Sequence, residues 1–518
     1  MMGTGEASGG TARRVSQRVL AGIERWGNRL PDPVTIFVAL ALLALVASWI
    51  AGTCGVAVVN PATGEMVRAV NLLDGPGIRR ILVNVVPNFT GFAPLGTVLV
   101  AMIGIGVAER TGLFAALLKA LVTAVPRGWV TPTLIFAGIM SNTAADAGYV
   151  ILPPLAALLY ASMRRHPLAG LAAVFAGIGG GFSANLLLSS LDPLLAGLST
   201  EAAHLLDPAY TVQATASYYL MAVSVVLLTV VGTVVSNRIV EPWIGPWKPD
   251  DSVATEESLE PLTRLERRGL WWALVATVVT VGAIALLVIP AGAPLRDAET
   301  GSIAPFYDSL VALLAIFFMA PGLTYGLVTR QVRSDRDTAR MMSDTMAAMG
   351  TYIVMAFFAG QFIAYFNWSN LGLIIAISGA EALKSAHLTG VPLMVGFIFV
   401  AATINLFMAS ASAKWAIMAP VFVPMLMVLG WSPETTQGLY RVGDSITNTI
   451  TPLNYYLPII IAVGRRYMPK LGMGTLLAAM LPYAVAFGLF WTVLVVAWVV
   501  LGVPIGPGAP LHYAVGGG

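Results

Sequence analysis

The sequence has little charge for its length. Asp, Glu, Lys and Arg make up 11% of its 518 residues, whereas an ordinary soluble domain contains about 25%. Hydrophobic residues make up 57%, and the mean hydropathy is +0.80. A water-soluble globule of this composition would expose a continuous apolar surface. The composition therefore excludes a soluble globular protein and a disordered chain, and it predicts a polytopic membrane protein.

Cysteine and histidine are also scarce. The single cysteine, Cys54, excludes a disulfide scaffold. The four histidines lie outside the long apolar runs, and no pair has the spacing of metal ligands. The net charge of +3 does not favour nucleic acid. We therefore expect no organic cofactor and no enzymatic activity. The expected partners are a small-molecule substrate and the lipid bilayer.

Long apolar runs, in contrast, are abundant. A membrane span needs roughly 20 mostly apolar residues. Complete runs of this kind occur at 33–52, 93–111, 215–237, 269–290, 308–328 and 472–501. Three further spans, at 167–199, 346–378 and 436–463, are interrupted by polar or Gly-rich residues. The sequence therefore predicts nine transmembrane helices.

Two apolar segments remain, at 129–163 and 391–430, and each has a polar kink in its middle. Each half is too short to cross the bilayer, so we expect two re-entrant helical hairpins. Non-helical backbone is tolerated at membrane depth only when it is buried in protein or lines a water-filled cavity. The predicted fold class is an all-α polytopic membrane protein with nine transmembrane helices and two re-entrant hairpins.

The less apolar segments suggest how the chain is divided. Residues 1–32 contain no cleavable signal and are expected to form a cytoplasmic amphipathic lead. The mixed-charge segment 248–268 is expected to be a cytoplasmic linker between two halves. In the outer loop, residues 57–80 are expected to form a small hairpin. The other predicted units are first spans and outer loop (33–128), first hairpin and broken span (129–199), a span (200–247), central spans (269–390), second hairpin and broken span (391–463), and last span with an outside tail (464–518).

The 29 Lys and Arg residues indicate an orientation. With nine spans and the N-terminus inside, 22 of them fall on the cytoplasmic face and five outside. Cytoplasmic loops carry an excess of Lys and Arg, so we expect an inner (plasma) membrane protein with a cytoplasmic N-terminus and an outside C-terminus. Two basic residues, Lys414 and Arg441, are left inside apolar segments.

The two halves share an order in which a hairpin precedes a broken span. The first hairpin turns at 141–146 between basic flanks, so we expect it to enter from inside, and the following span unwinds at 177–185. The second hairpin turns near 410–414 without a basic flank, so we expect it to enter from outside. Its broken span is expected to lose helix around 443–448. Broken helices at matching places in inverted repeats indicate the midplane site of a transporter.

Polar side chains gather at these turns and breaks. Interrupted helices expose NH groups that attract anions and carbonyls that attract cations. Any single polar side chain here could simply join helices by hydrogen bonds, but two matching clusters predict a substrate or ion site. The candidates are Ser141, Asn142, Thr143, Asp146, Asn185, Asn405, Asp444 and Asn448.

Ionisable residues inside spans cost roughly 2.5–3.5 kcal/mol on insertion scales and are therefore functional candidates. Asp192 has no obvious local basic partner, and a carboxyl group buried without one favours its protonated form. Such a group suits a proton carrier, although Asp192 could also cap a helix. Arg441 could bind a substrate carboxylate or sulfonyl group, or it could pair with Asp444 three residues away. Trp415, beside Lys414, could stack on an aromatic ligand or pack in the core.

Four stretches resemble the AbgT family of p-aminobenzoyl-glutamate and sulfonamide transporters. They read SNTAADAGYVILPPLAALL (141–159), GGGFSANLLLSSLDPLLAGLSTEAA (179–203), SASAKWAIMAPVFVPML (410–426) and YRVGDSITNTITPLNYYLPI (440–459). The resemblance covers nearly the whole chain. It implies a dimeric, bowl-shaped carrier with nine spans and two hairpins per subunit, related to the dicarboxylate carriers of the ion transporter superfamily. The Ser-Asn-Thr signature of those carriers occurs at 141–143, and its second copy is degenerate at 410–412.

The resemblance also implies roles for individual residues. The positions that match the family's residues for substrate passage and transport are Asp192, Ser412, Trp415, Pro433 and Arg441. The family role of the acid is in proton coupling. Asn405 and Asp444 match positions associated with a bound cation, so a Na⁺ ion could bind there.

The function that follows is secondary active transport of p-aminobenzoyl-glutamate, or export of sulfonamide drugs, driven by the proton motive force. A sodium-coupled dicarboxylate-type carrier is the alternative within transport. A channel and an intramembrane aspartyl protease are weaker alternatives, the latter because Tyr307-Asp308 and Gly443-Asp444 faintly resemble its two-aspartate signature.

Overall fold

The computed structural model describes residues 33–59, 64–123, 125–144, 147–247, 262–408, 410–454, 456–469 and 471–514. Within these ranges the chain is mostly helical, as expected, with one two-stranded sheet. The hairpin expected in the 57–80 loop is confirmed, because β1 (Ala57–Val59) pairs antiparallel with β2 (Met66–Arg68). The expected N-terminal lead, residues 248–261 of the expected linker, and Asp146 lie outside the described residues.

Among the described residues, seven helical segments are long and apolar enough to cross a membrane, and two bent helix pairs bring the number to as many as nine. The seven segments are Val34–Thr53, Gly75–Arg110, Tyr218–Ile244, Arg264–Val288, Leu310–Thr329, Ala411–Val428 and Met473–Val500. Long apolar runs fold as helices in lipid because a helix satisfies its own backbone hydrogen bonds.

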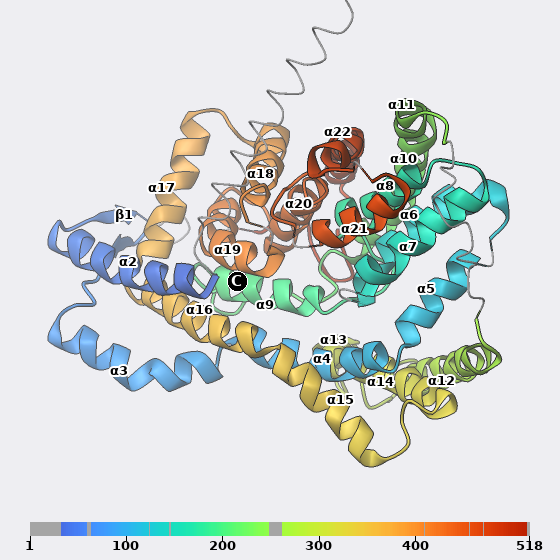
Figure 1. Ribbon diagram of the computed structural model, residues 1–518. Helices are drawn as coiled ribbons and strands as arrows, with labels where there is room; N and C mark the ends of the chain where they lie inside the picture. Colours follow the sequence, from blue (N-terminus) through green and yellow to red (C-terminus); the bar gives the residue numbers. More distant parts are fainter. Residues whose placement is uncertain are drawn as a thin grey trace, which may run out of the picture.

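Helices at the edge of the molecule form two groups (Figure 1). In one group, α14 (Leu310–Thr329) packs against both α4 (Ala93–Arg110) and α12 (Arg264–Val288). Small residues permit the close approach of α14 to α4, since a side chain on Gly104 would overlap the backbone of Ala315. In the other group, α16 packs along α2 and α3. Their bounds are α2 (Pro33–Thr53), α3 (Gly75–Thr90) and α16 (Gly350–Trp368).

The prediction of a single span at 346–378 is wrong in its boundaries. α16 ends at Trp368, and a separate helix, α17 (Leu371–Ser385), begins three residues later. Asn370 between them has a left-handed backbone (φ 59°), which a right-handed helix cannot contain. Instead, α15 (Asp335–Ala348) and α16 form one of the bent pairs that together are long enough for one span.

The remaining helices outside the repeats are α5 (Leu113–Thr123), α10 (Tyr218–Val235), α11 (Glu241–Ile244), α13 (Ala304–Asp308) and α22 (Met473–Val500).

The centre of the molecule contains the same series of elements twice. Each series consists of two helices joined by a short connecting segment, followed by a helix, a break and another helix. The first series is α6 (Val130–Ser141), α7 (Ala147–Ser162), α8 (Pro167–Phe175) and α9 (Leu191–Ala203). The second is α18 (Gly390–Asn405), α19 (Ala411–Val428), α20 (Pro433–Ile446) and α21 (Leu457–Tyr467). We call residues 142–144, which form a 3₁₀ turn, the first tip, and residues 406–408 and 410 the second tip.

The first break lies where the sequence predicts it, but the second begins later than expected. After α8 the chain forms a π-turn (Ala176–Gly180) and is irregular until α9. In the second series, α20 remains helical through Gly443 and Asp444, and the break runs from 447 to 456. Gly443 does not end the helix. A Cβ atom there would lie 2.5 Å from Ile398 O and 2.6 Å from Ala401 Cβ, so the missing side chain lets α20 approach α18.

The C-terminal segment 501–514 folds back onto the start of α20. His512 pairs with Trp431 as an isolated bridge, and the backbone NH of Ser432 donates to Leu511 O (3.1 Å). Two hydroxyl groups add to this contact, since Ser432 Oγ donates to Pro510 O (2.6 Å) and Thr435 Oγ1 to Leu511 O (2.9 Å). Residues 510–512 therefore hold the N-terminus of α20 in place.

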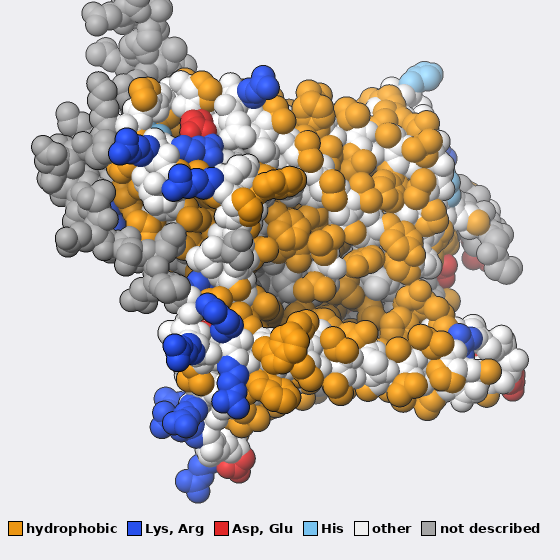
Figure 2. Space-filling view, turned by 90° about the vertical axis from the view of Figure 1, so that its right-hand side faces the viewer, with side chains coloured by type: hydrophobic (Ala, Val, Ile, Leu, Met, Phe, Trp, Pro, Cys, Tyr) orange, Lys and Arg blue, Asp and Glu red, His pale blue; other side chains and the backbone are white. Residues whose placement is uncertain are grey.

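Figure 2 shows one face of the molecule, over which apolar side chains form a broad surface. The Lys and Arg side chains on this face gather mainly at its left edge, beside that surface. α12 contributes to the apolar surface with residues such as Leu286, which is 71% exposed. An exposed apolar band bordered by basic residues is the surface expected of a helix bundle in a bilayer.

Candidate functional site

A cavity of about 500 Å³ lies where the two tips and the two breaks meet. Small-molecule sites commonly have volumes of about 300–1,000 Å³. Both series of helices contribute to the lining: Asn142 comes from the first tip, Ser410 and Ser412 from the second tip and the start of α19, and Asn448 from the second break. Three of the predicted residues, Asn142, Ser412 and Asn448, therefore line one cavity.

The first tip is bonded to the first break. Asn142 Nδ2 donates to Ile178 O in the π-turn (3.1 Å), and Thr143 Oγ1 donates to Asn185 Oδ1 (2.9 Å). Ser141 is fully buried and donates to Gly138 O of its own helix (2.7 Å), so in this structure it is a packing residue. The first break also contacts α20, because the backbone NH of Ser183 donates to Ser445 Oγ (3.1 Å).

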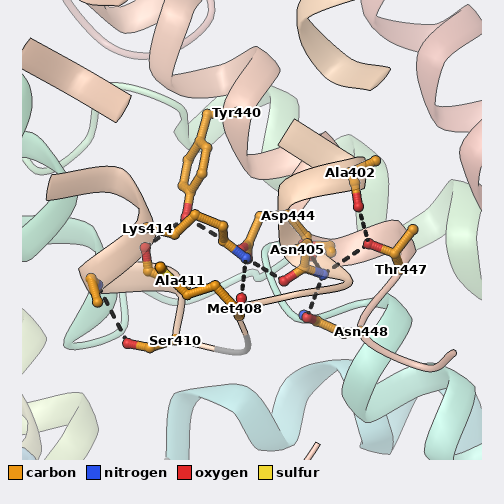
Figure 3. A network of polar contacts seen from close by, with 12 residues as sticks. Ala402, Asn405, Met408, Ser410, Ala411, Lys414, Tyr440, Asp444, Thr447 and Asn448 are labelled. Atoms are coloured by element: carbon orange, nitrogen blue, oxygen red, sulfur yellow. Dashed lines mark hydrogen bonds and ion pairs between the residues drawn. The ribbon is translucent and has the colours of Figure 1, made fainter. Parts of the chain in front are cut away.

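The two helix ends that flank the second tip are bonded to α20 and the second break by a denser network (Figure 3). Asn405 Nδ2 lies 2.5 Å from Asp444 O, 2.9 Å from Thr447 Oγ1 and 2.8 Å from Asn448 Oδ1. Lys414 Nζ lies 2.5 Å from Asp444 Oδ1 and is fully buried. In both series an Asn at the end of the first hairpin helix thus donates to a backbone carbonyl of the following broken span.

A second buried ion pair joins the two series. Arg441 Nη1 in α20 lies 2.5 Å from Asp192 Oδ1 at the start of α9, and the two residues are 3% and 0% exposed. The other carboxylate oxygen, Asp192 Oδ2, accepts from the backbone NH (2.6 Å) and the hydroxyl group (2.9 Å) of Ser189. Ser189 itself lines the cavity. The ion pair therefore lies directly behind the cavity wall.

These pairings correct two interpretations of the sequence. Asp192 is not without a basic partner, and Arg441 does not pair with Asp444. The side chains of residues three apart diverge by about 60° around a helix, so Arg441 reaches α9 whereas Asp444 reaches α19. Lys414, noted in the sequence only as a basic residue in an apolar segment, is the partner of Asp444.

Trp415 is fully buried and does not line the cavity. Its ring stacks on Tyr440 at a centroid distance of 4.4 Å, and its indole NH donates to Ser199 Oγ of α9 (3.0 Å). Trp415 therefore packs in the core between α9, α19 and α20 in this structure, which was one of the two interpretations left open. Pro433 is also buried, in the first turn of α20, where its lack of an NH group costs no hydrogen bond.

Aromatic groups that sequence reasoning missed form part of the cavity wall. Tyr149 of α7 and Tyr456 of the second break stack almost in parallel, with ring centroids 4.0 Å apart and an interplanar angle of 11°. Phe182 and Tyr352 line the cavity as well. Tyr149 and Tyr456 lie in two of the stretches that carry the family resemblance. Their aromatic character, together with the expectation that these two stretches meet at the site, is the signal that could have identified them.

Comparisons with known proteins identify the family of this chain. The model of the AbgT putative transporter family matches residues 18–513. The chain is 39% identical over 495 residues to the p-aminobenzoyl-glutamate transport protein of Escherichia coli (strain K12), covering 95% of this chain and 97% of that protein.

Two solved structures have the same fold. The YdaH transporter of Alcanivorax borkumensis, described as having an unusual topology, superposes with a TM-score of 0.87 at 44% identity, over 92% of this chain and 100% of that one. MtrF of Neisseria gonorrhoeae, described as illuminating a class of antimetabolite efflux pumps, gives a TM-score of 0.90 at 45% identity, over 95% and 100%. With a family match over nearly its whole length, this chain belongs to the AbgT putative transporter family.

Proposed function

We propose that this protein is a secondary active transporter of aminobenzoyl-type organic anions, with p-aminobenzoyl-glutamate or sulfonamides as substrates and a proton gradient as the driving force. The observation that carries the proposal is the cavity to whose lining both tips and both breaks contribute. A site built at the interface of two repeats is accessible alternately from either side when one repeat moves against the other.

The lining suits a ring that carries polar groups. Tyr149, Tyr352 and Tyr456 provide aromatic surface, and an aromatic ring gains about 0.5–1.5 kcal/mol from such a contact beyond its area burial. Ser410, Ser412 and Asn448 provide hydroxyl and amide groups for the amine or the amide of the substrate. This combination of aromatic and polar lining residues supports an aminobenzoyl compound over a short aliphatic dicarboxylate.

The ion pair behind the cavity suggests how substrate and proton are coupled. Arg441 is the cationic group that a substrate carboxylate or sulfonyl group would bind, and it is held by Asp192. A substrate anion that binds Arg441 displaces the Asp192 carboxylate. The displaced carboxylate is then buried without a counter-charge, and a proton taken up by Asp192 would cancel that charge. Anion binding at Arg441 and proton uptake at Asp192 are thereby coupled.

The same proposal includes the arrangement in the membrane. The excess of Lys and Arg in the segments assigned to the inside supports a cytoplasmic N-terminus and an outside C-terminus in the inner membrane. The segments α6–α7 and α18–α19 are then re-entrant hairpins that enter from opposite sides, with nine helices crossing fully. The family resemblance supports a homodimer.

Purified protein in proteoliposomes tests this function. Uptake of p-aminobenzoyl-glutamate and of a sulfonamide is measured with a proton gradient and a sodium gradient imposed separately. We expect flux that follows the proton gradient and is unchanged when K⁺ replaces Na⁺. Flux that needs a sodium gradient would contradict proton coupling and favour the sodium-coupled carrier. Flux of a short dicarboxylate in preference to either aromatic compound would contradict the substrate class.

A further inference from the structure

The ammonium group of Lys414 lies in an environment made of oxygen atoms. Asp444 Oδ1 is 2.5 Å away, Met408 O is 3.2 Å away, and Asn405 Oδ1 accepts a further hydrogen bond (Figure 3). Lys414 and Asn405 are both fully buried, and Asp444 is 1% exposed. The three oxygen atoms come from the end of α18, the second tip and α20, so a single ammonium group joins three separate segments.

These oxygen types are the ones that bind hard cations. Carboxylate, amide and backbone carbonyl oxygens are typical ligands of metal ions that prefer oxygen. Asn405 and Asp444 are also the two residues at which the family resemblance implies a bound cation. In this chain all three oxygen atoms already contact Lys414 Nζ.

The charges of the surrounding residues argue against a further cation. Lys414 with Asp444, and Arg441 with Asp192, form two pairs whose charges cancel. In the part of the chain that the structure describes, no cluster of three or more His, Cys, Asp or Glu side chains could hold a metal ion. A Na⁺ ion added beside Lys414 would bring an uncompensated charge into a buried site, which costs several kcal/mol. The residues therefore do not fit Na⁺ together with the lysine.

We propose that Lys414 is a built-in cation, whose ammonium group occupies the monovalent-cation site formed by Asn405, Met408 and Asp444 in place of Na⁺. Lys414 belongs to the first turn of α19, so its charge cannot be exchanged with the solvent. A sodium gradient therefore cannot act through this site. The lysine is a positioning residue that keeps the second tip attached to α20.

Na⁺ binding to the purified, full-length protein tests this inference directly. We expect no saturable binding of radioactive Na⁺ to the wild type and no difference between its melting temperatures in NaCl and KCl. In Lys414→Ala the space and the oxygen ligands remain while the ammonium is gone. We expect Na⁺ to bind this variant and to raise its Tm by roughly 2–4 °C relative to K⁺, as for a ligand that saturates only the folded state.

Three further measurements identify the site. Propylammonium replaces the atoms that Lys414→Ala removes beyond Cβ, so it should also stabilise this variant and compete with Na⁺. Lys414→Met keeps an unbranched apolar side chain that fills most of the space left by the lysine, so neither Na⁺ nor propylammonium should stabilise this variant. In Lys414→Ala/Asp444→Asn the carboxylate is absent, and the response to Na⁺ should be lost.

Two results would overturn the inference. One is saturable Na⁺ binding to the wild type that Asp444→Asn or Asn405→Ala abolishes, and this measurement does not depend on any Lys414 variant folding. The other is a folded Lys414→Ala protein that responds to neither Na⁺ nor propylammonium. No transport substrate is present in these experiments, so their outcome is independent of the substrate proposed above.

Discussion

Asp192 and Arg441, which are 249 positions apart in the sequence, form a buried ion pair with 2.5 Å between Oδ1 and Nη1. The pair connects α9 of the first series to α20 of the second. Both residues are at most 3% exposed, so each charge is compensated almost only by the other. One contact between the two series therefore consists of two charges that neither series can bury alone.

Breaking this pair should destabilise the protein and stop transport. Removing one partner of a buried pair costs about 3–5 kcal/mol because the other charge is left uncompensated. We expect Asp192→Asn and Arg441→Gln each to lower the Tm and abolish p-aminobenzoyl-glutamate flux. The double variant should recover most of the Tm but no flux. A double variant as unstable as the weaker single variant would show that the charges do not compensate each other.

Trp415 should act through packing and not through a ring contact with substrate in this conformation. Trp415→Phe keeps an aromatic face against Tyr440 and removes the indole NH, while Ser199→Ala removes the acceptor of that NH together with the bond from Ser199 Oγ to Gln437 Oε1. We expect both to lose about 0.5–1.5 kcal/mol of unfolding free energy with little change in KM. Trp415→Ala should lose about 3–5 kcal/mol. A large rise in KM in Trp415→Phe at unchanged Tm would instead indicate direct contact with the substrate.

The stacked tyrosines should determine affinity for the aromatic ring. Tyr456→Ala removes one ring of the pair at the cavity wall, and we expect a roughly tenfold rise in KM, the effect of about 1.4 kcal/mol of lost stacking. Tyr456→Phe keeps the ring and should transport like the wild type. Tyr219→Ala, on the 43% exposed Tyr219 of α10, is the control. Equal KM values in Tyr456→Ala and the control would remove Tyr456 from the substrate site.

Gly443 should tolerate no side chain. Its Cβ position lies 2.5 Å from Ile398 O, whereas nothing lies within 4 Å of the corresponding position at Gly396 of α18. We expect Gly443→Ala to lose about 1–3 kcal/mol from overpacking and Gly396→Ala to melt at the wild-type temperature or above. Thermal melts of the two variants in the same detergent make the comparison. A Gly443→Ala protein as stable as Gly396→Ala would show that α20 and α18 can separate without cost.

Ser432 should be important beyond its own helix. Its side chain accepts from the NH of Thr435 as the N-cap of α20 and donates to Pro510 O. We expect Ser432→Ala to lose about 1–2 kcal/mol of unfolding free energy, toward the upper end for a lost N-cap, because it also releases the C-terminal segment. Ser385→Ala, at an exposed serine of α17, should be neutral. Limited proteolysis should remove the C-terminal residues faster from Ser432→Ala, and an equal rate in both variants would contradict this role.

The sequence indicated which segments meet at the site but not which side chains pair there. The order of a hairpin followed by a broken span can be recognised in the sequence, because polar residues interrupt the apolar runs at matching places in the two halves. Asp192 and Arg441 pair across 249 positions, and no local spacing rule connects them. The local rule suggested Arg441 with Asp444, and the packing of α20 between α9 and α19 overrides it.

Some helix boundaries were likewise decided by contacts between distant residues and not by local sequence patterns. Gly443 could have ended a helix or allowed a neighbour to approach, and only the position of α18 decides between these roles. The continuous hydropathy of residues 346–378 gave no sign that the chain changes direction at Asn370. Asn can adopt the left-handed backbone found there, but it does not have to, so its presence alone did not predict the change. Such choices are made by tertiary contacts that composition does not encode.

The attachment of residues 510–512 to the start of α20 has a consequence for biosynthesis. The carbonyl groups of Pro510 and Leu511 accept hydrogen bonds from Ser432 and Thr435, at the start of the helix that carries Arg441 and Asp444. Because α22 (Met473–Val500) lies between α20 and these acceptors in the chain, the acceptors are synthesised after both helices. The start of α20 therefore gains these hydrogen bonds only after α22 has been synthesised.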